Sequence, residues 1–262
     1  MYLSKCNQYE SNTLMPFKDH FSKQSADYAK YRPHYPEALF AYLAAISPNK
    51  QVAWDCGTGN GQAALGLAPY FDLVIATDPS EKQIRNATPH EKIKYAVTPA
   101  EATGILPQSV DLITVAQALH WFDFARFYAE VRRVAPPGAI IAAWMYNLLY
   151  TEPAVTKIVS EYYFDIVGPY WPPERKHIES EYRSIPFPFA EVQAPAFTLA
   201  AHWNLEEMLG YLNTWSATQR YLAQTGDHPL NKIIDQLTTA WGDDAIKKRV
   251  EWPLCLRVGK IA

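Results

Sequence analysis

Residues 52–78 read VAWDCGTGNGQAALGLAPYFDLVIATD, and this stretch decides the fold that we expect. An apolar strand (Val52–Trp54) leads into a glycine-rich loop. A helix over about residues 61–70 and a second apolar strand (Leu73–Thr77) follow. A strand, a helix and a strand in this order form a βαβ unit, and such units build parallel sheets. The stretch therefore predicts an α/β protein.

The same alternation continues on both sides of this unit. A helix is expected before it, over Glu37–Ile46, where apolar residues recur at helical spacing until Ser47-Pro48-Asn49. After it we expect a helix near Ser80–Ala87, strands at Ile93–Val97 and Val110–Ala116, a helix over Asp123–Val134 and a strand at Ala139–Trp144.

The alternation of predicted strands and helices ends beyond Tyr146. Helical stretches around Ala154–Val167 and Leu205–Trp215 flank a run rich in proline and aromatic residues. The last thirteen residues, VEWPLCLRVGKIA, alternate in part and suggest a late strand at the edge of the sheet. We expect one domain over residues 1–262, with a core at about 37–145 plus late strands and a cover at about 146–245.

Composition narrows the class of protein. The net charge is −3, and no dense basic block suggests a nucleic-acid partner. No apolar run reaches the ~18 residues of a membrane span, so we expect a cytoplasmic protein with no membrane contact. Three separated cysteines lack the spacing of a zinc site or a disulfide framework, so we expect no metal.

The loop Asp55–Gly61 carries the strongest functional signal. Its three glycines allow a tight turn and a close approach of the backbone to a ligand. A dinucleotide fingerprint starting at Gly57 would need glycine in place of Gln62, and no P-loop string is present. The Asp55 carboxylate would crowd a pyrophosphate but suits an ammonium group, so we expect a ligand with an ammonium and no phosphate.

A second acidic residue, Asp78, ends the second strand. Its carboxylate can accept hydrogen bonds from both hydroxyl groups of a ribose. The alternative is a helix N-cap, because Asp78-Pro79-Ser80-Glu81 also resembles a helix start, although Ser80 could cap while Asp78 binds.

Further motifs add to this pattern. The chain contains Y-R-P-x-Y-P at residues 31–36, Ala100-Glu101 followed by Leu106-Pro107, and His120-Trp121-Phe122-Asp123. Over roughly residues 20–145 the sequence resembles the class I S-adenosylmethionine-dependent methyltransferases, in particular the small-molecule type 11 group (UbiE-like, trans-aconitate methyltransferase-like). The resemblance implies a Rossmann-like, mostly parallel sheet of seven strands with helices on both faces, and S-adenosylmethionine as cofactor.

The resemblance also assigns roles within the cofactor site. It implies that Asp78 holds the ribose, that Pro79 packs on the adenine, and that Ala100 or Glu101 lies beside the adenine amino edge. Relatives often have Asp just before the Ala-Glu pair, where this chain has Pro99. The methionine part would be held by Asp55, Gly57, Thr58, Gly59 and Gly61.

Two pairs of residues complete the expected cofactor pocket. Gln117 and Ala118 follow the fourth core strand, at the edge where open α/β sheets bind ligands, so we expect them near the sulfonium. Tyr28 and Arg32 are expected to close the pocket from the N-terminal side. For Arg32 the alternative is a surface ion pair or an anchor for the proline turn.

Methyl transfer needs alignment of the reactants, and it needs a base only if the acceptor still holds its proton. His120 is the candidate base, and the alternative is a structural residue fixed by Asp123 or a backbone group. Candidate acceptor-binding residues are Trp121, Tyr146, Trp171, Trp215 and Arg220, with core packing as the alternative for the aromatic ones.

The sequence thus predicts a methyltransferase that acts on a small organic acceptor, with O-methylation of a carboxylate as the first hypothesis. We expect a monomer or a homodimer. The alternatives are a non-catalytic S-adenosylmethionine-binding regulatory protein and a nicotinamide-dependent oxidoreductase.

Overall fold

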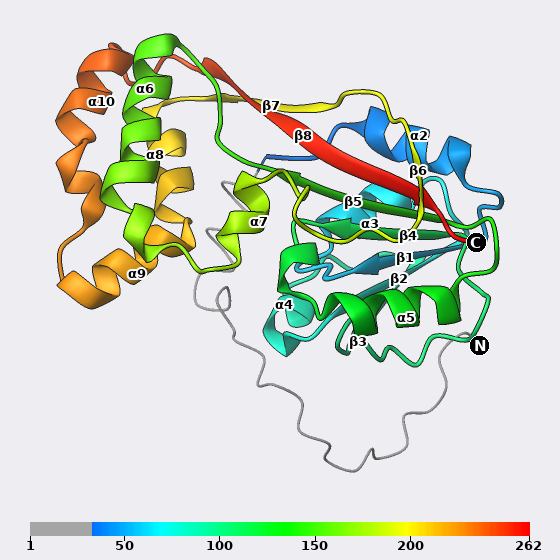
Figure 1. The fold of residues 1–262 in the computed structure, drawn as a ribbon. Coiled ribbons are helices and arrows are strands. Elements are labelled where there is room, and N and C mark those ends of the chain that lie inside the picture. Colours follow the sequence, from blue (N-terminus) through cyan, green and yellow to red (C-terminus); the bar gives the residue numbers. More distant parts are fainter. Residues whose placement is uncertain (1–32) are drawn as a thin grey trace.

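The computed structural model describes residues 33–262, and an eight-stranded sheet lies at its centre (Figure 1). The strand order is β3-β2-β1-β4-β5-β8-β6, and β7 pairs with β8 outside this path. The strands are β1 (Val52–Cys56), β2 (Leu73–Asp78), β3 (Ile93–Val97), β4 (Leu112–Ala116), β5 (Ile140–Tyr146), β6 (Ala190–Val192), β7 (Thr198–Trp203) and β8 (Lys248–Lys260).

The first five strands are parallel, and the later ones are antiparallel to their neighbours. This arrangement confirms the predicted Rossmann-like fold. The expected strand count of seven holds along the main path, and β7 is an eighth strand that the sequence pattern did not indicate. It pairs only with the first half of β8, beyond the part that joins β5.

Helices cover both faces of the sheet. The helices α2 (Glu37–Ile46) and α3 (Gln62–Leu67) pack on one face, and α5 (Phe124–Val134) packs on the other. The short helix α4 (Glu81–Arg85) contacts β2 and β3. Successive residues of a strand point to opposite faces, so Trp54 belongs to the α5 side and Ala53 to the α2 side.

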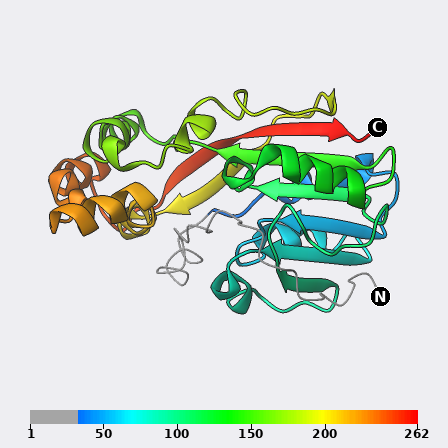
Figure 2. The same ribbon diagram turned by 60° about the horizontal axis from the view of Figure 1, so that its bottom comes forward.

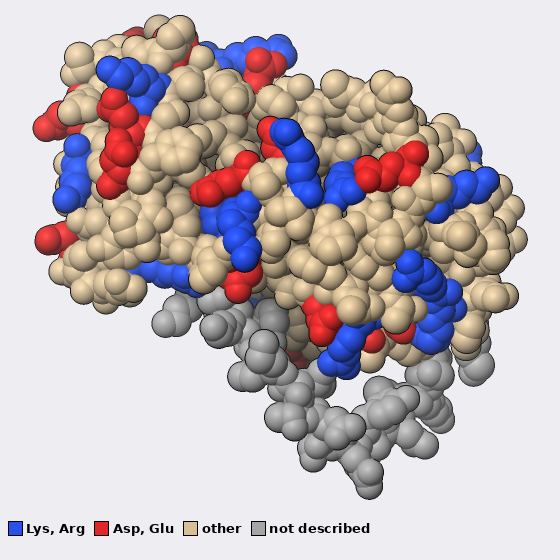
Figure 3. Space-filling view, in the orientation of Figure 1, with Lys and Arg blue, Asp and Glu red and all other residues tan. Residues whose placement is uncertain are grey.

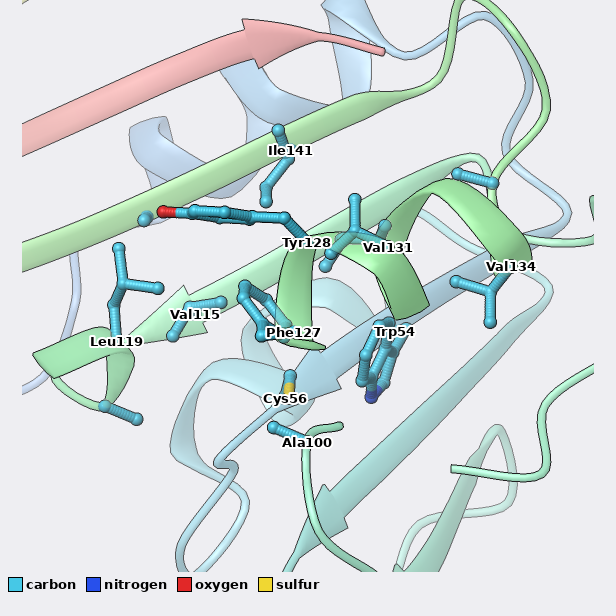
Figure 4. Packing of buried hydrophobic residues seen from close by; sticks show 14 of the residues in the cluster. Trp54, Cys56, Ala100, Val115, Leu119, Phe127, Tyr128, Val131, Val134 and Ile141 are labelled. Carbon is cyan, nitrogen blue, oxygen red and sulfur yellow. The ribbon is translucent and has the colours of Figure 1, made fainter. Parts of the chain in front are cut away.

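Figure 4 shows the core on the α5 side, where Trp54 and Cys56 of β1 meet Phe127 and Val131. Phe127, Val131 and Val134 are spaced by four and three residues, so one stripe of the helix faces the sheet. Asp123 caps the helix, because its side chain accepts a hydrogen bond from the Arg126 N–H. This cap fixes where the chain leaves the β4 edge.

The remaining helices and β7 form a cover beside the sheet, at the left of Figures 1 and 2. Its own apolar cluster includes Val159, Met208 and Leu212. The thirteen-residue β8 pairs with β7 of the cover through its first half and with β5 through its second half, which ties the two parts together. The helices are α6 (Pro153–Glu161), η3 (Tyr162–Ile166), η4 (Gly168–Tyr170), α7 (Arg175–Glu179), α8 (Leu205–Asn213), α9 (Ser216–Thr225), η5 (Pro229–Lys232) and α10 (Ile234–Trp241).

The sequence reading of the cover was incomplete. The helix expected over residues 154–167 is α6 followed by a π-helical turn, and the helix expected to end at Trp215 ends at Asn213. Trp215 is extended and starts α9 instead.

Charged side chains of both signs are interspersed on the face shown in Figure 3. No helix within residues 33–262 has the length and apolar character that crossing a membrane requires.

Candidate active site

The carboxyl ends of the parallel strands meet at one edge of the sheet. The register pairs Cys56 of β1 with Thr77 of β2, Asp78 with Val97 of β3, and Ala116 of β4 with Trp144 of β5. The glycine loop, the end of β2, and the segments that follow β3 and β4 are therefore neighbours. Open α/β sheets bind their ligands at this edge.

The glycine loop needs each of its three glycines for a physical reason. Gly57, Gly59 and Gly61 have φ angles of 69°, 57° and 89°, which side-chain-bearing residues rarely adopt. A Cβ atom on Gly57 would lie 2.5 Å from the Ala118 Cβ, and one on Gly61 would lie 2.3 Å from the Tyr95 hydroxyl. A Cβ on Gly59 would meet no protein atom within 4 Å. Gly59 is thus the point where a ligand can come close to the backbone.

Asp55 lies beneath this loop and is fully buried. Its carboxylate accepts a hydrogen bond of 2.6 Å from the Thr58 hydroxyl and one of 2.9 Å from the Thr114 hydroxyl. The pKa of Asp55 is raised to about 6. Burial is the main cause of the rise and repulsion from Asp78 adds to it, whereas the hydrogen bonds lower the pKa. The observed role of Asp55 and Thr58 is to shape the loop, and their contact with a ligand stays a prediction.

The raised pKa of Asp55 makes stability depend on pH. A carboxyl group that binds its proton more tightly in the folded chain stabilises the fold below its ordinary pKa of 3.8. This contribution, about 3 kcal/mol, is lost as the pH rises through about 6. Asp55→Asn has no carboxyl group to ionise, so we expect its stability not to fall in this range. Between pH 4 and 7 the melting temperature of the wild type should therefore decrease relative to that of Asp55→Asn. Thermal unfolding across that range checks this, and parallel curves would contradict it.

Asp78 links the glycine loop to the end of β2. One carboxylate oxygen accepts the Gly59 N–H at 2.9 Å, and the other accepts the Ser80 N–H at 2.9 Å. The alternative that Asp78 caps the next helix is wrong, because the Ser80 hydroxyl caps α4 by accepting the Gln83 N–H. Pro79, between them, is half-buried. The predicted contacts of Asp78 with a ribose and of Pro79 with an adenine stay predictions.

The segment after β3 is fixed to the start of α5. The Glu101 carboxylate accepts the Asp123 N–H at 3.0 Å, and Ala100 is buried beside Cys56, as Figure 4 shows. Ala118, after β4, is buried against Gly57. These residues therefore lie at the sheet edge where the cofactor pocket is predicted, and their contact with a cofactor stays a prediction.

A cavity adjoins this edge between the sheet and the cover. Its volume is about 80 Å³, and it is partly open to solvent. Its lining residues are Gln117, His120, Trp121, Tyr146, Asn147, Leu148, Trp171, Pro172, Arg175, Ile178, Tyr211, Trp215 and Ser216.

The structure thus brings most of the predicted acceptor residues together. Trp121, Tyr146, Trp171 and Trp215 line the cavity with His120, although they come from separate segments of the chain. Arg220 is not among the lining residues. Tyr28 and Arg32 lie outside the described residues.

Arg175 is the lining residue that sequence reasoning missed. Its Nε donates to the Tyr163 hydroxyl at 2.6 Å and its Nη2 donates to the Asn147 Oδ1 at 3.0 Å. The guanidinium also stacks over the Trp171 ring, 4.3 Å from its centre. Both hydrogen-bond partners are neutral, and within residues 33–262 Arg175 forms no ion pair. Its charge faces the rings of Trp171 and Tyr163.

His120 is held by a residue other than those expected. Its Nδ1 lies 3.0 Å from the Tyr182 hydroxyl, whereas Asp123 caps α5. Burial, together with the nearby charges of Arg175 and His177, lowers the pKa of His120 to about 3. The imidazole is therefore neutral at physiological pH.

Comparisons with known proteins agree with this arrangement. The methyltransferase domain family matches residues 54–143. A Dictyostelium discoideum protein described as a putative methyltransferase is 34% identical over 233 residues, which are 87% of this chain and 89% of that protein. The chain belongs to the class I S-adenosylmethionine-dependent methyltransferases.

A solved structure extends the likeness to the whole fold. A solved structure from Anaeromyxobacter dehalogenans, described as a putative type II methyltransferase, is 48% identical, with a TM-score of 0.83, and the match covers 88% of this chain and 98% of that one. A Saccharomyces cerevisiae protein described as a probable S-adenosylmethionine-dependent methyltransferase is 31% identical over half of this chain. The chain is thus an enzyme that uses S-adenosylmethionine, and the oxidoreductase alternative is wrong.

The site has room and chemistry for this methyltransferase cofactor. The space beside Gly59 admits a close ligand, and the Asp78 carboxylate at the same edge suits a pair of hydroxyl groups. The adjoining cavity provides a place for an acceptor, which the alternative of a non-catalytic binding protein does not require.

Proposed function

We propose that this methyltransferase transfers a methyl group to an oxygen of a small organic acid. The observation that carries the proposal is the lining of the cavity, which contains the cation of Arg175 and, among the described residues, no Asp or Glu. An arginine fork binds a carboxylate better than any neutral group, and the binding is strongest away from bulk water.

Two side chains of the cavity lining have nitrogen donors that could bind the carboxylate of such an acid. The Arg175 Nη1 and the Asn147 Nδ2 form no hydrogen bond within residues 33–262. They lie together, because Asn147 accepts from the same guanidinium. Both side chains line the cavity, and we propose that their remaining N–H groups bind one anion there.

The aromatic side chains that line the cavity beside Arg175 and Asn147 suit an acceptor with a flat, apolar part. Trp171 and Trp215 lie with their ring centres 5.7 Å apart, and Tyr146 and Tyr211 also line the cavity. Aromatic walls bury apolar surface while a few polar groups fix the orientation of a ligand. We therefore propose an acceptor that carries a carboxylate on an apolar or aromatic body.

A carboxylate also fits the weak basicity of His120, the histidine among the described lining residues, whose pKa is lowered to about 3. When bound, S-adenosylmethionine supplies a methyl group that the positive sulfur has already activated. An ionised carboxylate oxygen needs no proton removed before it forms the new bond. The residues of the cavity then have to orient the acceptor and exclude water.

A panel of acceptors tests this proposal. Purified protein with labelled S-adenosylmethionine should convert apolar or aromatic carboxylic acids to methyl esters. Amides of the same acids, which match them in shape but lack the charge, should not react. If no acid across a broad panel is esterified while amines or phenols are methylated, the carboxylate proposal is wrong.

A further inference from the structure

We propose that His120 binds the acceptor as a neutral imidazole, with Tyr182 as the positioning residue that holds it, so that Nε2–H donates to an acceptor oxygen. This inference rests on the proposed function. It replaces the base expected from the sequence with a hydrogen-bond donor that sets acceptor specificity.

The position of the ring supports this role. His120 lies in η2 (Leu119–Trp121), which follows β4 at the ligand-binding edge, and it lines the cavity where η2 packs against the Arg175 helix. Its Nδ1 contacts the Tyr182 hydroxyl, while its Nε2 forms no hydrogen bond within residues 33–262. One ring nitrogen is thus fixed by the protein and the other is left for a ligand.

Its burial and its backbone conformation hold the Tyr182 side chain in one orientation. It is fully buried, and it and Glu181 have φ angles of 61° and 53°, although neither is glycine. This left-handed backbone is strained for residues that carry a side chain, and it persists where the surroundings enforce it. Arg257 on β8 enforces this turn, because its Nη1 donates to the Tyr182 and Ile185 carbonyl groups at 3.1 and 2.8 Å.

The hydrogen bonding of Tyr182 selects the tautomer of His120. The Tyr182 hydroxyl is buried, and the His120 Nδ1 is the hydrogen-bond partner that it has among residues 33–262. Because a buried O–H group is rarely left without an acceptor, we infer that this hydroxyl donates to Nδ1. Burial raises the pKa of Tyr182, so the phenol keeps this hydrogen. With Nδ1 as the acceptor, the neutral ring carries its proton on Nε2.

The charges around His120 favour the neutral ring. Arg175 and His177, both on α7, are the charged or titratable groups that face it besides Tyr182, and each disfavours an imidazolium. Asp123, the acidic residue nearest in the chain, is turned to the Arg126 N–H. No carboxylate of the described residues hydrogen-bonds the ring.

Matched substitutions of His120 test the donor role. Glutamine can place an N–H near the position of Nε2 but cannot act as a base, and leucine can do neither. With the acid that the wild type esterifies, we expect His120→Gln to keep kcat/KM within about 5-fold. We expect His120→Leu to lose about 30-fold. Equal loss in both variants would overturn the proposal, and His202→Gln, which is exposed on β7 and outside the lining, serves as control.

The pH profile and a direct titration separate this inference from the proposed function. We expect kcat/KM to show no inflection near pH 6.5, and NMR of the cofactor-bound protein to show His120 neutral, with its proton on Nε2, down to about pH 5. Tyr182→Phe should allow the other tautomer to appear. A His120 that titrates near 6.5 would overturn the inference, whichever acceptors are methylated. A panel with no esterified acid would contradict only the proposed function.

Discussion

Gly59→Ala is expected to weaken binding of S-adenosylmethionine by about 100-fold while the protein stays folded. The added methyl group meets no protein atom within 4 Å, so the free chain bears only the strain of a φ of 57°. The same methyl group enters the space in which we expect the cofactor to approach the loop. Forcing an extra carbon into a filled contact costs about 1–3 kcal/mol, and 2.7 kcal/mol corresponds to ~100-fold.

Gly226→Ala is a matched control for this experiment. Gly226 has a φ of 78°, has no atom within 4 Å of an added Cβ, and ends α9 in the cover. Both variants should lose a similar, small amount of stability, and only Gly59→Ala should lose cofactor affinity. Calorimetry with S-adenosylhomocysteine and thermal unfolding measure the two effects. Equal affinities for the two variants would show that the cofactor does not lie against Gly59.

The core could be predicted because its signals are local. The strand Ile93–Val97 and the helix Glu37–Ile46 have the expected bounds, since a short apolar run and a stripe at helical spacing each define an element by themselves. The backbone conformation of the glycine loop could also be predicted from the sequence. Positive φ angles at Gly57, Gly59 and Gly61 are what three glycines at a strand-to-helix turn indicate.

The cover could not be predicted to the same extent, because its contacts join distant segments. The left-handed turn at Glu181 and Tyr182 contains no glycine, and the carbonyl contacts of Arg257, more than 70 residues later in the chain, hold it. The sequence offered Arg220 as the cation of the acceptor site, whereas the structure places Arg175 there. Only the proximity of Arg175 to Trp171 in the sequence hinted at a stacked cation.

Arg175→Met is expected to raise the KM for a carboxylate acceptor by about 100-fold with little effect on cofactor affinity. Methionine keeps much of the apolar stem against Trp171 but removes the N–H groups that face the cavity. Hydrogen bonds to charged groups contribute roughly 1.5–3 kcal/mol, and a carboxylate left without its partner in a cavity costs further free energy. Steady-state kinetics with the esterified acid measure the change.

Arg220→Met and Arg175→Lys complete this test. Arg220 belongs to the same cover but does not line the cavity, so its loss should leave the KM near the wild-type value. Lysine keeps the charge at position 175 but cannot bond Tyr163, Asn147 and a ligand through one planar group, so its KM should lie between the wild type and Arg175→Met. If Arg175→Met and Arg220→Met raise the KM equally, the guanidinium in the cavity does not bind the acceptor. An unchanged KM in Arg175→Lys would show that charge alone, without the planar fork, is enough to hold the acid.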